Sequence, residues 1–383
     1  MGLKTDMSNK QDIPWKFIFL NFIVLRIVTF IAAVVGFAKL PFKPSFPYSD
    51  TILSQFGHPL LWSWANFDGV HYLMLAKDGY VYGLTQAFFP GYFILIRIVN
   101  FLLHNYLISA LLISHICFIL SLAVFYKLLR IDYSDKVAKR AIIFVSLFPT
   151  SFYFLAAYTE SLFLLLLLLS FYYLRKVNLK EVGLWGIGLS FSRIIGIFIV
   201  PSILLELKNN KTNINWKKIF WILLPSLGLL AYMFYLWVKF EDPFLFAHVQ
   251  SGFGAGRETG KLVLLYQVIW RYVKMIFTVD KNNPIYFTVW LEMLASLYAI
   301  GLLIWGYIKK VRPSYLLFSF LSFLLPTLTG TFSSMPRYIL VLFPIYIVLA
   351  TIKNKYVRYL ILSIHFILLF ICTMLFTRGY WIA

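Results

Sequence analysis

The sequence predicts an all-α polytopic membrane protein, and three observations lead to this fold class. Of the 383 residues, 61% are hydrophobic and only 13% are charged. The mean hydropathy is +0.80. The apolar residues form runs of the length that a helix needs to cross a bilayer, about 20 residues. A soluble domain cannot bury so much apolar surface, so we expect one integral-membrane domain over residues 1–383.

The net charge of +20 reflects an excess of Lys and Arg, and the clusters of these residues predict the orientation of the chain in the membrane. In membrane proteins an excess of Lys and Arg in short loops marks the cytoplasmic side, so we expect no nucleic-acid partner. The basic clusters that serve as fixed points are Lys4–Lys16, Lys127–Arg140, Arg175–Lys180, Lys208–Lys218, Lys309–Arg312 and Lys353–Arg358.

With these clusters on one side, the apolar runs predict a bundle of about nine full spans. The first run is longer than a signal peptide and lacks a small-residue cleavage site, so we expect it to be retained. Both cysteines, Cys117 and Cys372, lie in apolar runs, which excludes a disulfide framework. The predicted spans are Phe17–Ala38, Tyr106–Tyr126, Ala141–Tyr158, Ser161–Leu174, Ile219–Val238, Ile285–Ile308, Tyr315–Thr331, Tyr338–Thr351 and Leu360–Phe376.

Three further segments do not fit full spans. The stretch from Lys180 to Lys208 is too short for two crossings and predicts a hairpin of short helices with Arg193 near its tip. Counting Phe88–Leu103 as a crossing would move the Lys127 loop to the other side, so we expect a tilted or re-entrant outer-leaflet helix. An outer loop, 39–105, and a second outer segment, 239–283 with the amphipathic piece Leu262–Phe277, complete the chain.

This topology gathers polar residues at the non-cytoplasmic face. An ionisable side chain at membrane depth costs about 2.5–3.5 kcal/mol, so such residues tend to line functional cavities. The sequence therefore predicts one outward-facing polar site, and its candidate residues are Asp68, His71, Tyr72, Tyr158, Glu160, Arg193, Gln250, Arg337 and Tyr338.

The stretch "NFDGVHYLMLAKDGY" contains the candidate base. Partial desolvation would raise the pKa of Asp68 and make it a base toward a hydroxyl, and His71 would lie one helical turn later. The alternative is an interfacial loop in which Asp68 caps a helix within an aromatic belt that includes Tyr72.

The two arginines indicate an anionic ligand. Arg193 and Arg337 are suited to forked contacts with a lipid phosphate, or each pairs with a nearby carboxylate. We expect Glu160 to bind a sugar hydroxyl or a divalent ion, or to be only an acid that interacts favourably with the dipole at a helix N-terminus. Gln250 is compatible with sugar binding. The glycine-rich "GFGAGRE" has no preceding strand, so it does not predict a nucleotide site. A sugar donor would therefore arrive on a lipid.

Six stretches, in this order, resemble one family: "NFDGVHYLMLAKDGY", "FFPGYFILIRIV", "FPTSFYFLAAYTESLFLLLLL", "SFSRIIGIFIVP", "EDPFLFAHVQ" and "MPRYILVLFPIY". They are similar to the motifs of the PIG-V family, the GPI mannosyltransferases that add the second mannose, and of their prokaryotic relatives. The chain departs from the family pattern at Phe67, where the family has Trp, and in "FFPGYF", which lacks the second proline. These departures concern fine specificity, because neither removes a charged group.

The resemblance implies a GT-C-like bundle and an inverting transfer of a sugar, mannose in this family, from a polyprenyl-phosphate donor. It implies Asp68 as the base toward an acceptor hydroxyl, with Arg193 or Arg337 on the leaving phosphate. The acceptor is a lipid, a glycan or a protein. No metal ligands or cofactor are assigned, and a divalent cation is left open. The expected location is a prokaryotic cell membrane with the site on the outer face, or an endoplasmic reticulum membrane with a lumenal site.

A transporter or flippase of a lipid-linked or anionic substrate is the alternative, because it also predicts inward-facing arginines and broken helices. It is disfavoured because the ionisable residues crowd at one face and the chain shows no internal repeat.

Overall fold

The computed structural model describes residues 12–44, 48–258 and 260–382, and over these ranges the chain forms helices and turns without a β-strand. The predicted all-α class is confirmed. The basic cluster Lys4–Lys16 lies outside the described residues up to residue 11. The α-helices are α1 (Trp15–Lys39), α2 (Ser49–Leu53), α3 (Pro59–Trp62), α4 (Asp68–Asp78), α5 (Pro90–Leu103), α6 (Tyr106–Leu129), α7 (Asp135–Ser146), α8 (Glu160–Arg175), α9 (Leu179–Ser192), α10 (Ile199–Asn209), α11 (Trp216–Leu223), α12 (Ser226–Phe240), α13 (Leu245–His248), α14 (Leu265–Thr278), α15 (Ile285–Ile308), α16 (Pro313–Thr327), α17 (Met335–Tyr338), α18 (Pro344–Ala350) and α19 (Lys355–Thr377). The 3₁₀ helices are η1 (Ser54–Phe56), η2 (Ser63–Ala65), η3 (Thr85–Ala87), η4 (Ser151–Leu155), η5 (Ile194–Phe198), η6 (Val249–Phe253) and η7 (Ile339–Val341).

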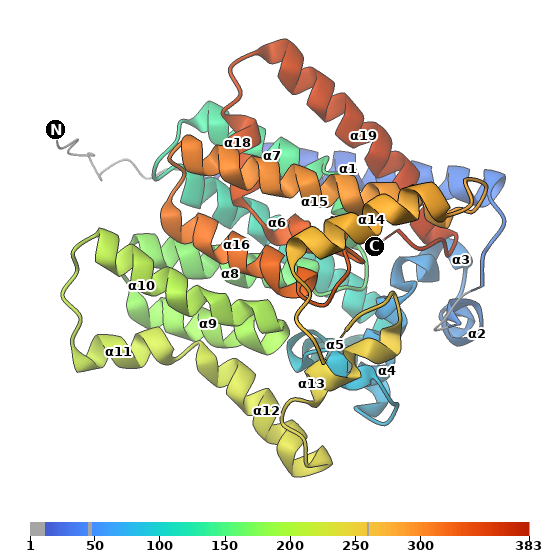
Figure 1. Ribbon diagram of the computed structural model, residues 1–383, viewed down its shortest axis with the longest axis horizontal. Helices are drawn as coiled ribbons and strands as arrows, with labels where there is room; N and C mark the ends of the chain where they lie inside the picture. Colours follow the sequence, from blue (N-terminus) through green and yellow to red (C-terminus); the bar gives the residue numbers. More distant parts are fainter. Residues whose placement is uncertain (1–11, 45–47, 259, 383) are drawn as a thin grey trace.

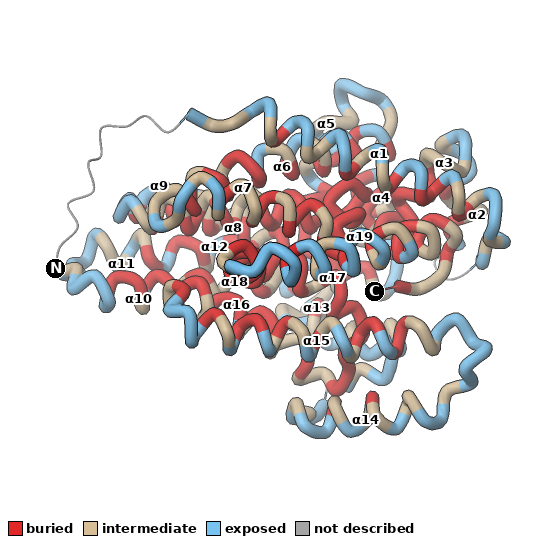
Figure 2. The backbone as a smooth tube through the Cα atoms, turned by 90° about the horizontal axis from the view of Figure 1, so that it is seen from above, coloured by how far each residue is buried: buried red, intermediate tan, exposed pale blue. Residues whose placement is uncertain are grey.

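The core of the molecule lies around α6, α8 and α18. Helix α6 packs along α8, while α18 packs between α7 and α15 and is buried at every residue. Helices α1 and α19 pair on one side of this core, and α9 and α12 pair on another (Figure 1). Helix α14 lies at the edge of the molecule, where it contacts α15 (Figure 2).

Among the residues that the structure describes, four helices are long and apolar enough to cross a membrane: α1, α6, α15 and α19. Helices α11 and α12 together form a fifth candidate, bent by 54° at the break between them. Many large apolar side chains on these helices are exposed, among them Leu20 at 59% and Ile367 at 55%. The chain is a multi-pass membrane protein, whereas the number of about nine spans stays a prediction.

Besides Ile219–Val238, which is interrupted between α11 and α12, two further segments predicted as full spans are not continuous helices. In the run Ala141–Tyr158 the helix α7 ends at Ser146 and η4 follows a turn that contains Pro149. In the run Tyr338–Thr351 the chain passes from α17 through η7 to α18, which begins at Pro344. Proline lacks the N–H that continues a helix, so both runs break although their composition is apolar. Both breaks lie in the segments that lead to the candidate site.

The segments expected to be irregular agree better with the structure. Helix α9 ends at Arg193, whose backbone is extended (φ −158°, ψ 146°), and η5 and α10 follow. This matches the predicted pair of short helices with Arg193 at the tip. Helix α5 has 14 residues, which is shorter than a crossing. Helix α14 coincides closely with the amphipathic piece predicted at Leu262–Phe277.

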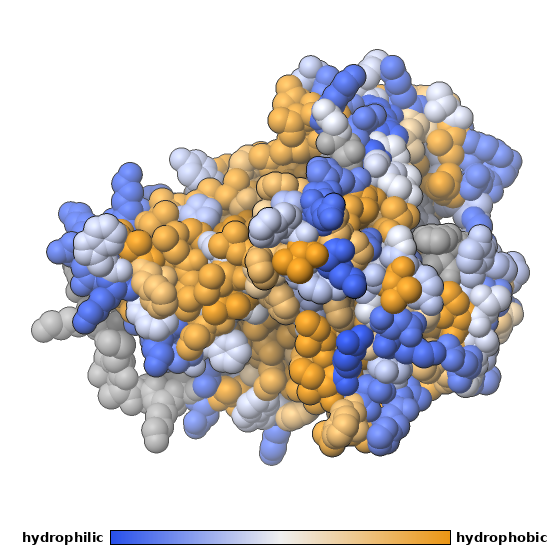
Figure 3. Space-filling model, turned by 90° about the horizontal axis from the view of Figure 1, so that it is seen from below, coloured by the Kyte–Doolittle hydropathy of each residue, from blue (hydrophilic) through white to orange (hydrophobic). Residues whose placement is uncertain are grey.

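The two ends of the bundle differ in character. The turns that follow α6, α8, α10 and α15 carry the basic clusters and lie at the left in Figure 1, whereas α2, α3, α4 and α13 lie at the right. On the face shown in Figure 3, apolar side chains gather over the middle and hydrophilic ones lie toward the left and right ends. The basic loops therefore share one end, and the outer loops predicted from the sequence share the other.

An ion-pair network ties the basic end together. Asp132, after α6, accepts hydrogen bonds from Arg175 and from Arg312, whose Nε lies 3.0 Å from its Oδ2. Arg312 also binds Glu206, at 3.1 Å, and Glu206 accepts a bond from Ser314. Burial would raise the pKa of Asp132, but the hydrogen bonds and charges of the two arginines outweigh it and lower the pKa to about 2.

We predict that Asp132→Asn lowers the free energy of unfolding by about 1–2 kcal/mol, since two arginines lose a shared carboxylate that is partly exposed. Thermal unfolding in neutral detergent would measure it. The depressed pKa means that the contribution is present above about pH 4 and is lost as the pH falls toward 2. Asp135→Asn, which removes the exposed pair with Lys139 but keeps a side-chain oxygen for the hydroxyl of Tyr126, should change stability by less than about 0.5 kcal/mol. Equal effects of the two substitutions would contradict the network.

Candidate active site

A large cavity opens among the helices at the end opposite the basic loops. Its volume is ≈ 1180 Å³. Eight of the predicted residues line it: Asp68, His71, Tyr72, Glu160, Arg193, Gln250, Arg337 and Tyr338. His248 also contributes, whereas Tyr158 lies behind the wall and is 1% exposed. The structure thus brings the predicted residues to one place, and their roles stay predictions.

Asp68 is the first residue of α4, and the residue before it is strained. Phe67 has φ 57° and ψ −119°, a conformation that an L-residue rarely adopts. Its ring packs against Phe376 and Trp381, at centroid distances of 5.9 and 5.1 Å, which holds the backbone in place. Strained residues of this kind cluster at functional sites, and here the conformation of Phe67 sets the direction of the Asp68 side chain.

The carboxylate of Asp68 is paired with Arg337, at 2.5 Å between Oδ2 and Nη1. The side chains of Asp68 and Arg337 are 17% and 8% exposed. Burial would raise the pKa of Asp68, but the charge and hydrogen bond of Arg337, with smaller contributions from His71 and Arg257, lower it. The expectation that desolvation raises this pKa was therefore wrong, because it left out the arginine. Asp68 is ionised at neutral pH.

Glu160 joins a second arginine to the first. Its Oε1 lies 3.0 Å from Nη1 of Arg193 and 3.5 Å from Nε of Arg337. Glu160 begins α8, where an acid interacts favourably with the helix dipole, and it is 1% exposed. Its Oε2 has no hydrogen-bond partner among the described residues. Two carboxylates and two guanidinium groups thus form a network without net charge, with one acceptor oxygen to spare.

Aromatic rings enclose the guanidinium of Arg337. Its Cζ lies 5.2 Å from the ring centre of Tyr338, 5.4 Å from Tyr158 and 5.7 Å from Tyr153. Arg193 shares the Tyr338 ring, also at 5.2 Å. The hydroxyl of Tyr158 donates to the backbone oxygen of Asn66, two residues before Asp68. Tyr158 therefore supports the network from behind and orients the segment that carries Asp68.

The remaining predicted residues lie on the wall nearest α4. The ring of His71 contacts Phe88 and Phe253, and burial lowers its pKa against the raising effect of Asp68, so the ring is neutral at pH 7. Tyr72 packs edge-on against Phe88. Gln250 donates from Nε2 to the backbone oxygen of Phe246 and keeps its own oxygen available.

One glycine allows this wall to approach Arg193. A Cβ at Gly91, in "FFPGYF", would come within 2.6 Å of Ser192 Oγ and 3.1 Å of Phe191 O. The start of α5 therefore rests directly on the end of α9, next to Arg193.

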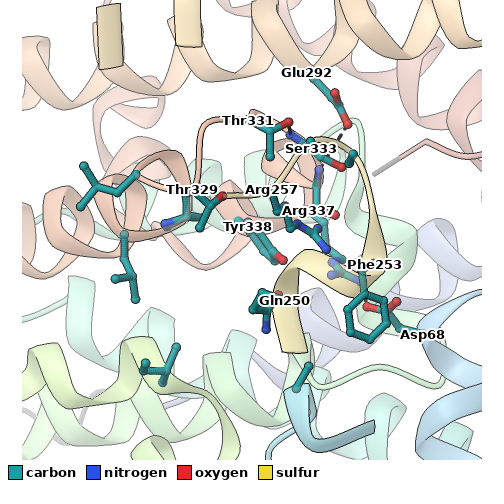
Figure 4. Close-up of a pocket in the computed structure, with 18 of the residues that line it drawn as sticks. Asp68, Gln250, Phe253, Arg257, Glu292, Thr329, Thr331, Ser333, Arg337 and Tyr338 are labelled. Carbon is teal, nitrogen blue, oxygen red and sulfur yellow. Dashed lines mark hydrogen bonds and ion pairs between the residues drawn. The ribbon is translucent and has the colours of Figure 1, made fainter. Parts of the chain in front are cut away.

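Sequence reasoning missed a set of residues on the other side of the cavity. Arg257 and Arg271 come from the outer segment, and Glu292 comes from α15. Figure 4 shows Arg257 reaching into the cavity on the side of Arg337 and Tyr338, with Glu292 beyond Ser333. Arg257 has no ion-pair partner among the described residues, whereas Arg271 donates to the backbone oxygens of Gly256 and Gly330. The signal was the basic, glycine-rich "GFGAGRE", which was considered only as a nucleotide loop.

Glu292 holds the turn that presents Arg337. Its Oε1 accepts the backbone N–H of Ser334, and its Oε2 accepts the hydroxyl of Tyr272. Ser334 has φ 68°, in the left-handed region, and begins the short helix α17 that carries Arg337. The signal was the charge of Glu292 itself, because an acid inside the predicted span Ile285–Ile308 is costly unless it lines a cavity or is paired.

The cavity has a polar side and an apolar side. The apolar side is lined by Leu262, Met275, Ile285, Val289, Leu325 and Leu328, from α14, α15, α16 and the adjoining loops. In the part of the chain that the structure describes, no group of three or more His, Cys, Asp or Glu side chains is placed to hold a metal ion. The charged pairs therefore stand beside a surface suited to a hydrocarbon chain.

One protein-family model matches a part of the chain. Residues 17–203 match the model of the mannosyltransferase (PIG-V) family. The resemblance drawn from the motifs is confirmed over this range, which includes Asp68, Glu160 and Arg193. A match to this mannosyltransferase family supports glycosyltransferase activity. No curated protein is similar enough to the chain to count as a match.

Solved structures give a weaker likeness. The oligosaccharyltransferase of Archaeoglobus fulgidus, tethered to an acceptor peptide, is 12% identical to this chain, with a TM-score of 0.48. The match covers 95% of this chain and 55% of the oligosaccharyltransferase chain. The same protein in complex with Zn and sulfate is 13% identical, with a TM-score of 0.44, over 94% of this chain and 53% of its own. The chain thus spans about half the length of these proteins.

We predict that Glu292→Ala lowers the free energy of unfolding of the protein by about 2–3 kcal/mol, since the Ser334 N–H and the Tyr272 hydroxyl lose their acceptor. Glu292→Gln, which keeps one acceptor oxygen, should cost about 1 kcal/mol or less. Thermal unfolding would measure both. Glu258→Ala, at an exposed acid of the same cavity, is the control. A melting temperature of Glu292→Ala equal to that of the control would disprove the anchoring role.

Proposed function

We propose that the protein is an inverting GT-C glycosyltransferase that moves mannose from a polyprenyl-phosphate donor to an acceptor hydroxyl at the face opposite the basic loops. The observation that carries this proposal is the ionised carboxylate of Asp68 on the wall of a half-apolar cavity. The mannosyltransferase family match supports the sugar. The chemistry of the cavity supports the lipid.

Asp68 is the proposed base. Its carboxylate accepts the proton of an acceptor hydroxyl, and the hydroxyl oxygen forms a bond to the anomeric carbon of the donor sugar. The bond between that carbon and the phosphate oxygen breaks, and polyprenyl phosphate leaves with the electron pair. The lowered pKa makes Asp68 a weak base but keeps it unprotonated, which suits a reaction whose leaving group is already an anion.

Arg257 is the proposed ligand of the leaving phosphate. Both arginines expected in this role, Arg193 and Arg337, are bound to carboxylates, as the alternative interpretation of them foresaw. Arg257 has no such partner in the described ranges, lines the cavity and lies near enough to Asp68 to lower its pKa. A guanidinium that is not already neutralised gives the greatest stabilisation of charge that develops during the reaction.

The network around Glu160 is the proposed sugar contact. The Oε2 of Glu160 and the side-chain oxygen of Gln250 are acceptors with no hydrogen bond inside the described structure, and both residues line the cavity. Sugar hydroxyls are donors that would satisfy them. The apolar side, with Met275, Val289 and Leu325, would hold the first isoprene units of the donor.

We predict that Asp68→Asn lowers the transfer rate by about 10²- to 10⁴-fold without unfolding the protein, because Asn cannot accept the proton. Transfer from polyprenyl-phosphate mannose to a membrane extract would measure it. Asp78→Asn, at the exposed end of the same helix, is the matched control and should keep the wild-type rate. A folded Asp68→Asn protein with normal turnover would remove Asp68 from the mechanism.

We predict that Arg257→Gln raises the KM for the donor about tenfold, since one charge-assisted contact is lost. Because the charge of Arg257 helps to lower the pKa of Asp68, the same variant should also move the acidic limb of the pH–rate profile to higher pH. Lys281→Gln, in the same outer segment but away from the cavity, should change neither. An unaltered donor KM in the Arg257 variant would refute the phosphate contact.

We predict that a cysteine at Gly83 reacts with an impermeant thiol reagent added from the outside of cells. Gly83 is exposed in the loop after α4, and a Cβ there meets nothing within 4 Å. The native Cys117 and Cys372 are buried and should stay unlabelled. Asn213→Cys, in the basic loop after α10, should react only in opened membranes. The reverse labelling pattern would overturn the proposed orientation.

A further inference from the structure

A second, smaller cavity lies at the basic end of the molecule, between α7 and α19. Its volume is ≈ 410 Å³. Four of its eight lining residues are cationic, namely Lys136 and Arg140 of α7 and Lys355 and Arg358 of α19. The other four are Ile143, Phe144, Tyr359 and Leu362. We call these eight residues the basic groove.

The charge of the basic groove is uncompensated. No acidic residue is among the described residues that line it. The nearest acid on α7, Asp135, is bound to Lys139 at 2.9 Å and accepts the hydroxyl of Tyr126. Burial and the charge of Arg358 lower the pKa of Arg140, which shows that the cations of the two helices face one another. An anion between α7 and α19 would remove this repulsion.

The side chain of one of the four cations, Arg358, is held in place by hydrogen bonds within the protein. The side chain of Arg358 is 9% exposed, and its Nη1 donates to the backbone oxygens of Ile352 and Lys353 at 2.7 and 2.9 Å. A guanidinium held in this way loses little freedom when it binds phosphate. The side chains of the three other cations, Lys136, Arg140 and Lys355, line the same groove and can contact the same ligand.

The position of the groove along the helices points to a lipid. Its cations belong to the first two turns of α7 and the first turn of α19, and its apolar residues follow within the next two turns of the same helices. The outer face of α19 continues with exposed apolar side chains, including Tyr359 at 63% and Leu360 at 62%. Cations at headgroup level above apolar side chains match the order of groups in a phospholipid.

We propose that the basic groove binds the phosphate headgroup of an anionic phospholipid in the leaflet on the side of the basic loops. The lipid phosphate lies among Arg140, Lys355 and Arg358, and its acyl chains run along Phe144 and Leu362. The bound lipid joins α7 to α19. This site is separate from the cavity that contains Asp68 and does not depend on the proposed reaction.

The test compares two variants that lose the same charge at the same end of the protein. One is Lys136→Gln/Arg140→Gln/Lys355→Gln, in the basic groove. The control is Lys211→Gln/Lys217→Gln/Lys309→Gln, at exposed residues outside it. The purified full-length proteins are incubated with phosphatidylglycerol or phosphatidylcholine in neutral detergent. Retained lipid is counted by native mass spectrometry, and melting temperatures without lipid verify that both variants fold.

We expect the groove variant to retain about tenfold less phosphatidylglycerol than the wild type, and the control variant to retain the wild-type amount. Phosphatidylglycerol, but not phosphatidylcholine, should raise the melting temperature of the wild type and of the control only. Equal losses in both variants would reduce the effect to general surface charge and overturn the proposal. Unchanged retention in the groove variant would do the same. Displacement of the lipid by inorganic phosphate at equal concentration would show an anion pocket without lipid recognition.

Discussion

The structure depends on the neutralisation of two carboxylates at one end of an apolar helix bundle. Glu160 is buried and Asp68 is largely buried, and an unpaired carboxylate in such a place either costs several kcal/mol or becomes protonated. Arg337 and Arg193 prevent this, because each binds one carboxylate and Arg337 approaches both. The network keeps Asp68 ionised where water is scarce. It also leaves neither arginine free, so the proposed reaction assigns the leaving phosphate to another cation of the cavity, Arg257.

The backbone breaks around the cavity follow from this requirement. A continuous helix presents its side chains along its length, but four charged groups can converge only if several chain segments end at the same place. Phe67 and Ser334 adopt left-handed conformations just before Asp68 and Arg337, and the extended Arg193 ends α9. The turn at Pro149 is joined to the Arg337 segment by a hydrogen bond from Thr150 Oγ1 to Pro336 O, at 2.6 Å. Prolines and residues in strained conformations thus interrupt the helices, and these interruptions allow the charged side chains to point toward one place.

Much of this arrangement was predictable from the sequence, and the exceptions have physical causes. The long apolar runs that form α1, α6, α15 and α19 can be predicted as spans from hydropathy alone. Once the basic loops are placed on one side, the remaining polar residues are predicted to lie at the other end. Hydropathy does not register a proline within an apolar run, so the breaks at Pro149 and Pro344 were missed. The pairing of Asp68 with Arg337 joins residues 269 positions apart, and no local pattern encodes it. Glu292 was missed because it is a single acid within a predicted span and was not considered apart from that span. Arg257 was missed because its loop was compared only with nucleotide-binding motifs.

The central claim is that one ionised carboxylate acts as a base, with no covalent sugar intermediate on the protein. The anomeric configuration of the product tests this most directly, because a single displacement inverts that carbon whereas a covalent intermediate retains its configuration. Nuclear magnetic resonance of the mannosylated product, compared with the donor, would determine it. The account predicts the opposite configuration in product and donor, and the same configuration in both would contradict it.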